Sequence, residues 1–280
     1  MSKPTWSPVA RKGGGPPVAV ITGASSGIGA EFARQLASAG MGLVLVARRR
    51  ERLAKLAQEL ASSSSAPVEI EVCDLTDRES LEALAERLSS RSDIDLLVSS
   101  AGVALVGRFA AAEVSRQISL LDLHVIAPTR LTRAVLPQMI ARGHGAVIQV
   151  SSLAGMFSRL SSPTYGSSKA YLNAFSESLA EETSGTGVCF QALCPGFTVT
   201  ELHSTPEFDG IDIHARIPGV LWLSAERVVR ESLVGLAEGK RVVVPGRRYR
   251  WLRALAGNRY SIALACRWRA GRRWRRRVEP

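Results

Sequence analysis

Three side chains in the middle of the sequence, Ser152, Tyr165 and Lys169, carry groups that could move a proton at a carbon–oxygen bond. Tyr165 and Lys169 stand four residues apart in a helix-length stretch, so their side chains share one face of the expected helix. A phenol titrates at about pH 10 in water, and a neighbouring ammonium group favours the phenolate, which would make Tyr165 a usable acid or base near neutrality. The Ser152 hydroxyl, at a strand-to-loop junction, can donate to an oxygen on which negative charge develops. Together the three residues predict interconversion of a carbonyl and an alcohol.

A glycine-rich segment near the N-terminus predicts the cofactor. Residues 22–29 read Thr-Gly-Ala-Ser-Ser-Gly-Ile-Gly, follow an apolar run at 18–22, and open into a helical pattern at 30–39. Glycines let the backbone turn tightly and approach a pyrophosphate, while the free amides and the dipole at the helix start attract the anion. The spacing differs from Gly-x-Gly-x-x-Gly, but the position between strand and helix favours a dinucleotide site. The predicted contacts are Gly23, Ser25, Ser26, Gly27, Ile28 and Gly29.

The end of the second expected strand indicates which dinucleotide binds. An NAD site needs a carboxylate there to accept hydrogen bonds from the ribose hydroxyls, and the sequence has Arg48, Arg49 and Arg50 instead. The planar guanidinium of Arg48 suits a 2′-phosphate, so NADPH or NADP+ is expected in preference to NADH. We interpret Arg49 and Arg50 as the start of a solvated helix, which is also the alternative for Arg48.

Asp74 and Leu75 follow the third expected strand and are further candidates for the cofactor site. The Asp74 carboxylate could accept from the adenine amino group, or it could cap the helix that begins near Asp77. Sequence position leaves both alternatives open.

Short apolar runs alternate with longer amphipathic stretches from residue 18 to residue 245. Several runs are continuously apolar, as strands are when helices cover both faces of a parallel sheet. The pattern predicts a single doubly wound α/β domain of the Rossmann type over 18–245, with a flexible leader at 1–17 and an Arg-rich tail at 246–280. The expected strands lie at 18–22, 43–46, 68–72, 96–99, 146–150, 188–193 and 241–244.

Composition bears on compartment and metal content. No N-terminal apolar run and no stretch of about 18 apolar residues is present, so neither a secretion signal nor a spanning helix is predicted, and a cytoplasmic protein is expected. The cysteines lack the paired spacing of a zinc site and are expected as buried thiols, with no metal. They are Cys73, Cys189, Cys194 and Cys266.

The net charge of +11 belongs to one end of the chain: residues 246–280 hold 12 arginines and one glutamate, which leaves the first 245 residues neutral. This asymmetry argues against a nucleic-acid-binding body. Aromatic and aliphatic residues interleave with the arginines, a composition suited to a helix lying on an anionic membrane surface. The alternatives are a solvated extension and, less favoured, a nucleic-acid contact. The apolar residues are Trp251, Leu252, Leu255, Tyr260, Ile262, Leu264, Trp268 and Trp274.

The glycine segment, the Ser152, Tyr165 and Lys169 set, and the Pro195-Gly196 pair after the sixth expected strand together resemble the short-chain dehydrogenase/reductase family over residues 18–245. The resemblance implies that Tyr165 is the proton donor or acceptor, that Lys169 also holds the nicotinamide ribose, and that Ser152 orients the substrate oxygen. Further cofactor contacts are expected at Ser100, Gly102, Pro195, Gly196, Thr198, which would contact the nicotinamide amide, and Thr200.

Two departures from the family pattern concern the site. Ser99-Ser100-Ala101-Gly102 stands where the family usually has Asn-Asn-Ala-Gly, and the shorter serine side chains alter the expected cofactor contacts. His124 stands at the position of a catalytic asparagine that helps to hold a water linked to the lysine. His124 could replace that relay, or it could be a histidine hydrogen-bonded within a helix.

Residues 200–222 mix apolar side chains with polar ones and resemble the family's substrate lid, which favours a hydrophobic or lipid-like carbonyl or alcohol. A competing hypothesis is an NADPH-binding redox sensor whose altered relay has cost it turnover. Family members commonly associate through the helix that carries the tyrosine, so a homodimer is expected, with Tyr171, Leu172 and Phe175 available for contact.

Overall fold

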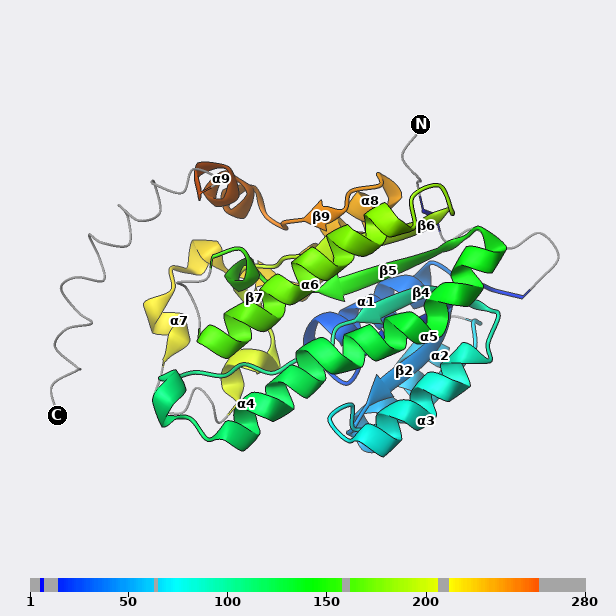
Figure 1. The fold of residues 1–280 in the computed structure, drawn as a ribbon, viewed down its shortest axis with the longest axis horizontal. Coiled ribbons are helices and arrows are strands. Elements are labelled where there is room, and N and C mark those ends of the chain that lie inside the picture. Colours follow the sequence, from blue (N-terminus) through cyan, green and yellow to red (C-terminus); the bar gives the residue numbers. More distant parts are fainter. Residues whose placement is uncertain (1–5, 8–14, 63–64, 158–161, 206–211, 257–280) are drawn as a thin grey trace, which may run out of the picture.

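The chain is described by a computed structural model over residues 6–7, 15–62, 65–157, 162–205 and 212–256. Its central feature is a seven-stranded parallel sheet with the order β3-β2-β1-β4-β5-β6-β9 (Figure 1). The chain runs outward from β1 to β3, then returns to place β4 on the other side of β1. This reversal defines a doubly wound sheet, so the predicted Rossmann-type fold is confirmed.

The strands of the main sheet form at the predicted positions to within two residues, and all but β3 and β9 have every residue buried. The last one is shorter than expected because it pairs with β6 alone, through Val242 and Val243. The strands of the main sheet are β1 (Val18–Thr22), β2 (Gly42–Ala47), β3 (Val68–Val72), β4 (Ile94–Ser99), β5 (Gly145–Val150), β6 (Val188–Leu193) and β9 (Val242–Val243). A separate parallel pair, β7 (Thr198–Val199) and β8 (Leu223–Ser224), was not predicted.

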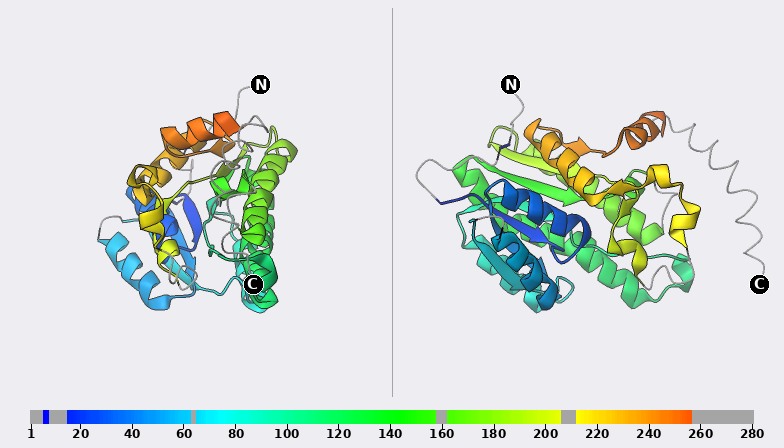
Figure 2. Two further views of the ribbon diagram at one scale, coloured as in Figure 1. Left: turned by 90° about the vertical axis from the view of Figure 1, so that its left-hand side faces the viewer. Right: turned by 180° about the vertical axis from the view of Figure 1, so that it is seen from behind.

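Helices cover both faces of the sheet. Phe32, Leu53 and Leu236 of α1, α2 and α8 pack in one apolar core, and Leu81 and Leu131 of α3 and α5 pack in the other. Figure 1 shows α5 and α6 in front of the sheet, and the right-hand view of Figure 2 shows α1 and α8 on the opposite face. The helices are α1 (Gly27–Ser38), α2 (Arg50–Ala61), α3 (Arg78–Ser89), α4 (Val114–Leu121), α5 (Ala127–Arg142), α6 (Pro163–Glu182), α7 (Ile213–Arg216), α8 (Ala225–Ala237) and α9 (Arg247–Ala256).

The fold extends beyond the expected limits of 18–245 at both ends. Trp6, in the expected leader, is 3% exposed and belongs to the apolar core. Tyr249, in the expected tail, is 4% exposed and lies in α9. The remainder of the tail, from residue 257, and residues 1–5 and 8–14 of the leader lie outside the described residues. Of the helices in the described ranges, none combines the length and apolar character needed to cross a membrane.

Three of the four cysteines are buried free thiols, as expected: Cys73, Cys189 and Cys194. Burial raises the pKa of Cys73 to about 11, and it raises the pKa of Cys194 to about 12. Both side chains therefore stay protonated near neutral pH and behave as small apolar groups. Cys266 lies outside the described residues.

Candidate active site

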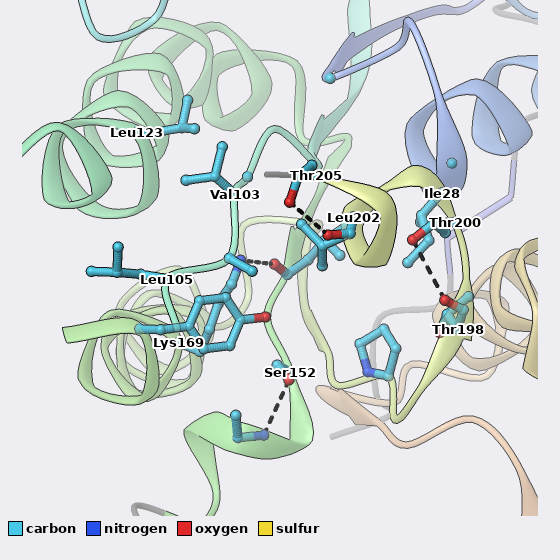
Figure 3. Close-up of a pocket in the computed structure, with 18 of the residues that line it drawn as sticks. Ile28, Val103, Leu105, Leu123, Ser152, Lys169, Thr198, Thr200, Leu202 and Thr205 are labelled. Atoms are coloured by element: carbon cyan, nitrogen blue, oxygen red, sulfur yellow. Dashed lines mark hydrogen bonds between the residues drawn. The ribbon is translucent and has the colours of Figure 1, made fainter. Parts of the chain in front are cut away.

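The predicted site residues gather at the edge of the sheet where the parallel strands end. Gly23 follows β1, Arg48 follows β2, Ser100 follows β4, Ser152 follows β5 and Pro195 follows β6. In a doubly wound sheet, this edge binds ligands where the strand order reverses, which here is between β1 and β4. All five residues line one cavity of about 2750 Å³ (Figure 3). Its volume exceeds that of ordinary small-ligand pockets, so it can hold a dinucleotide beside a substrate.

The structure brings the predicted catalytic residues together. Tyr165 and Lys169 lie one turn apart on α6, and the Lys169 Nζ is 5.8 Å from the centroid of the Tyr165 ring. The Nζ donates to the carbonyl oxygen of Val150 at 2.9 Å, which fixes the ammonium at the end of β5. The Ser152 Oγ accepts from the Ala154 amide at 3.1 Å (Figure 3), and its hydroxyl also forms a hydrogen bond with Tyr165.

Burial controls the protonation of this group more strongly than was expected. Burial raises the pKa of Tyr165, and a hydrogen bond with Ser152 opposes part of that rise. Burial also lowers the pKa of Lys169 to about 8. The expected lowering of the phenol's pKa by Lys169 is not found, and burial sets the direction of the shift. Tyr165 is a neutral phenol near pH 7, which is the form that can donate a proton.

His124 occupies a five-residue π-helical turn (Asp122–Ile126) between α4 and α5, and it is buried. Its Nε2 accepts from the Val103 amide at 3.0 Å, so the ring proton is on Nδ1, which donates to the Ser168 Oγ at 3.0 Å. The Ser168 hydroxyl in turn donates to the Tyr165 carbonyl at 2.9 Å. A neutral imidazole has one donor and one acceptor, and protein groups use both.

This geometry corrects the predicted relay role of His124. The ring has no free nitrogen to hold a water, and burial and the nearby charge of Lys169 push the pKa of His124 well below its ordinary value. The ring therefore stays neutral in mildly acidic solution. His124 instead connects the backbone at Val103 to α6, next to Tyr165, whose ring centroid is 5.7 Å away in an edge-on arrangement.

The glycine segment has the geometry that an anion site requires. Gly23 has φ +68°, and a Cβ there would lie 2.8 Å from the Ala101 Cα. A Cβ on Gly29 would lie 2.4 Å from the Gly23 carbonyl oxygen. Ser26, which precedes α1, makes no side-chain cap hydrogen bond, and the first turn holds no acidic residue. The helix start thus keeps free amides beside the cavity, which is lined here by Gly23, Ser25, Ser26, Gly27 and Ile28.

The arginines after β2 lie beside this segment. Arg48, which lines the cavity, has 65% of its side chain exposed, and its Nη1 is 3.6 Å from the Asp74 Oδ2. Arg49 was expected to be solvated, but its Nη2 donates to the Oγ atoms of Ser25 and Ser26, both at 2.9 Å. Its Nη1 donates to Glu201 at 3.0 Å. Two guanidinium groups, rather than one, therefore lie where a 2′-phosphate is expected.

The two alternatives for Asp74 are separated by its hydrogen bonds. The residue that caps α3 is Asp77, whose carboxylate accepts from the Ser80 amide at 2.8 Å. Asp74 instead accepts from the amide and hydroxyl of Thr76, at 2.9 and 2.7 Å. Asp74 and Leu75 line the cavity, so the cap reading is wrong for Asp74 and a cofactor contact remains predicted.

The remaining expected cofactor residues also line the cavity: Ser100, Gly102, Pro195, Gly196, Thr198 and Thr200. Thr22 was not predicted as a site residue; its Oγ1 accepts from the amides of Ser100 and Ala101 at 3.0 and 3.1 Å and so joins the ends of β1 and β4. The Oγ of Ser99 is buried and makes no hydrogen bond within the described ranges, as its short reach would suggest. These residues fit a dinucleotide.

Apolar side chains form a wall along part of the cavity. Val103, Leu105 and Leu123 lie near Lys169, while Ile28, Thr198 and Thr200 lie across the cavity (Figure 3). The described parts of the expected lid add Leu202, Ile213 and Leu221 to the lining. Phe208 and Ile211 of that lid lie outside the described residues. Tyr249 and Leu252 of α9 line the cavity as well, and the sequence analysis did not place them there.

Comparisons with known proteins agree with this site. A family model described as short chain dehydrogenase matches residues 17–207. An uncharacterized oxidoreductase of Staphylococcus saprophyticus is 34% identical over 186 residues, which are 66% of this chain and 80% of that protein. A short-chain dehydrogenase from Sphingobium yanoikuyae, solved in complex with NADPH, is similar with a TM-score of 0.79 and 35% identity over 88% of this chain and 95% of that one.

A second solved structure is the bulky-bulky ketone specific alcohol dehydrogenase from Comamonas testosteroni. Its TM-score is 0.75, with 28% identity, and the match covers 89% of this chain and 94% of that one. The family match extends over more than half of the chain and includes the glycine segment and the Ser152, Tyr165 and Lys169 set. The chain therefore belongs to the short-chain dehydrogenase/reductase family of oxidoreductases.

Proposed function

We propose that this protein transfers a hydride between NADP(H) and a hydrophobic carbonyl or alcohol. The observation that carries the proposal is a single cavity in which Ser152, Tyr165 and Lys169 lie between the glycine segment and an apolar wall. The name of the Comamonas testosteroni relative, specific for bulky ketones, is consistent with an apolar substrate.

The side chains of this protein have separate roles in carbonyl reduction. The nicotinamide, when bound, supplies the hydride. Ser152, whose hydroxyl is held by the Ala154 amide and is hydrogen-bonded to Tyr165, turns its hydrogen to the substrate oxygen. Tyr165 gives its phenolic proton to the same oxygen as negative charge develops there. The ammonium of Lys169 stabilises the resulting phenolate, and the apolar wall excludes water.

The choice of NADP(H) rests on the charge beside the glycine segment. Arg48 and Arg49 lie directly after β2, and the Ser25 hydroxyl accepts from Arg49. Their guanidinium groups suit a 2′-phosphate, whereas no carboxylate directly follows β2 to accept from ribose hydroxyls. The similarity to a structure solved with NADPH supports the same choice.

The decisive experiment measures NADPH consumption with a panel of aliphatic, aromatic and alicyclic ketones. We expect turnover with at least one apolar member, and Tyr165→Phe should lower it by about 100-fold or more while NADPH still binds, because only the proton donor is lost. NADPH binding with no consumption across the panel would contradict the proposal and favour the competing NADPH-binding sensor.

We further propose a cytoplasmic homodimer that associates peripherally with anionic membranes through its Arg-rich C-terminal segment. Tyr171 and Phe175 of α6 stack on one another with ring centroids 5.3 Å apart and are partly exposed, which supports their use in a dimer contact. Leu172 was expected at the same surface, but it is 1% exposed because it packs inside the protomer.

A further inference from the structure

Tyr249 attaches the C-terminal helix α9 to the substrate side of the cavity. Its hydroxyl donates to the Leu221 carbonyl at 2.6 Å and accepts from the Phe197 amide at 3.1 Å. One phenol thus joins the loop after β6 to the short helical turn at Gly219–Leu221, although these segments lie 52 and 28 positions away from it in sequence.

The ring of Tyr249 is held as firmly as its hydroxyl. It packs against Gly196, where a Cβ would lie 2.1 Å from the Tyr249 Cζ. The glycine of the Pro195-Gly196 pair is therefore needed to admit this ring. Any larger residue at 196 would displace either the loop after β6 or α9.

Polar contacts on the flanks of Tyr249 fix the rest of the helix. Arg248 Nη1 donates to the Val220 carbonyl at 2.9 Å. Arg250 Nη1 pairs with the Glu231 Oε2 of α8 at 2.7 Å, and the same carboxylate oxygen accepts from the Gly246 amide at 3.0 Å. Figure 1 shows α9 at the same end of the molecule as α7.

Leu252 and Trp251 of α9 differ in where they stand relative to the cavity. Leu252 lines the cavity and is 47% exposed, whereas Trp251 is 69% exposed and does not line it. These two adjacent apolar residues therefore offer one position that lines the cavity and one position that faces solvent.

We propose that α9 forms the outer wall of the substrate site, with Leu252 as a specificity-determining residue for the apolar part of the substrate and Tyr249 as the positioning residue that holds the wall in place. The inference rests on the proposed function in taking the substrate to be a hydrophobic carbonyl compound. A longer apolar chain on the ketone reaches Leu252, and a short ketone does not.

The test uses the full-length protein with NADPH and methyl ketones from 2-butanone to 2-undecanone. Leu252→Ala should raise KM for the longest ketone by about tenfold, with kcat and the KM for 2-butanone unchanged. Trp251→Ala is the matched control and should behave as the parent. Leu252→Met, which keeps an apolar side chain of similar volume, should retain the parental KM for the longest ketone, so that loss of the contact is separated from a folding defect.

Tyr249→Phe tests the positioning role, because it keeps the ring against Gly196 and removes only the bridging hydroxyl. We expect a higher KM for 2-undecanone and a smaller rise in the KM for 2-butanone, because the hydroxyl holds α9 in place. Equal KM values for Leu252→Ala, Trp251→Ala and the parent across the series would overturn the proposal that α9 forms a wall of the substrate site.

A binding measurement separates this inference from the proposed function. N-Octylacetamide carries an apolar chain but no reducible ketone, and calorimetry with NADP+ present reports its affinity. If the parent reduces no ketone but binds this amide, with weaker binding in Leu252→Ala only, the role of α9 in the substrate site is supported and the proposed reaction is contradicted. If ketones are reduced but Leu252→Ala binds the amide as the parent does, the role of α9 in the substrate site is contradicted and the proposed reaction is supported.

Discussion

Lys169 keeps a charge in a place where burial opposes it. Its side chain is 5% exposed, and burial lowers its pKa to about 8, so the ammonium loses its charge as the pH rises through that value. Tyr165 shifts in the opposite direction, since burial raises the pKa of its phenol. The pair therefore has a charged lysine beside a neutral phenol near pH 7, which suits proton donation to a carbonyl oxygen.

His124 should make the stability of the protein depend on pH. Burial and Lys169 depress the pKa of the native imidazole, so below about pH 6.5 the unfolded chain binds a proton that the native protein does not. The free energy of unfolding should therefore fall with acid, and His124 should contribute up to about 1.4 kcal/mol per pH unit to this slope. Urea unfolding at several pH values measures it.

His124→Asn should remove this contribution to the slope whatever it does to the stability at neutral pH. Identical slopes for the parent and His124→Asn would show that the buried ring is protonated in the native state, against the hydrogen bonds to Val103 and Ser168.

Glu201 should weaken NADPH binding, because its carboxylate pairs with Arg49 and Arg52 beside the expected 2′-phosphate. These pairs are exposed, and such pairs contribute about 1 kcal/mol at most, so Glu201→Gln should tighten NADPH by up to about fivefold and leave NADH nearly unchanged. Equilibrium binding of both cofactors gives the ratio. Arg48→Asp should change the ratio in the opposite direction, and unchanged ratios in both variants would place the 2′-phosphate elsewhere.

At the scale of elements, the features that could be predicted from the sequence are the local ones. The strand at 18–22, the glycine turn and the start of α1 lie within a dozen consecutive residues, so their pattern is readable without tertiary contacts. Arg49 and Tyr249 could not be placed in this way. Arg49 meets Glu201 152 positions away, and Tyr249 meets Phe197 52 positions away, so only the folded chain reveals those contacts.

The same difference between local patterns and contacts of distant residues explains why the role of His124 could not be predicted. Its alignment with a family position suggested a relay linked to the lysine, and the structure places its ring beside that of Tyr165. Its hydrogen-bond partners decided its role, and they come from the loop after β4 and from α6. Neither partner could be identified from the spacing of residues around position 124.

The turn between β1 and α1 should not tolerate a methyl group at Gly29. The Cβ of Gly29→Ala would lie 2.4 Å from the Gly23 carbonyl oxygen, and backbone on both sides prevents either atom from moving away. We expect loss of NADPH binding, or a lower Tm if the turn opens instead, as measured by calorimetry and thermal unfolding. Gly219→Ala is the control, since its Cβ meets nothing within 4 Å. Normal NADPH affinity in Gly29→Ala would show that the loop has another conformation.

At the scale of the whole molecule, charge and structure are divided along the chain. The first 245 residues carry no net charge, and residues 246–280 carry the whole +11. The fold nevertheless continues past 245, because α9 lines the cavity and Tyr249 holds it there. The described part of the Arg-rich segment, up to residue 256, therefore belongs to the site.

This division determines how the membrane proposal should be tested. A deletion from 246 would remove Tyr249 and Leu252 together with the arginines, and it would confuse loss of the substrate wall with loss of charge.

Deletion of residues 257–280 keeps α9 and removes eight of the 12 arginines. Because arginine attraction to anionic lipid is screened by salt, this deletion should abolish most of the salt-sensitive binding to phosphatidylserine vesicles. Co-sedimentation at low and high salt measures the binding, and vesicles of phosphatidylcholine alone are the lipid control. Turnover of a short soluble ketone should be unchanged, since no residue of the described site is lost. Equal sedimentation of the full chain with both kinds of vesicle would rule out electrostatic attachment.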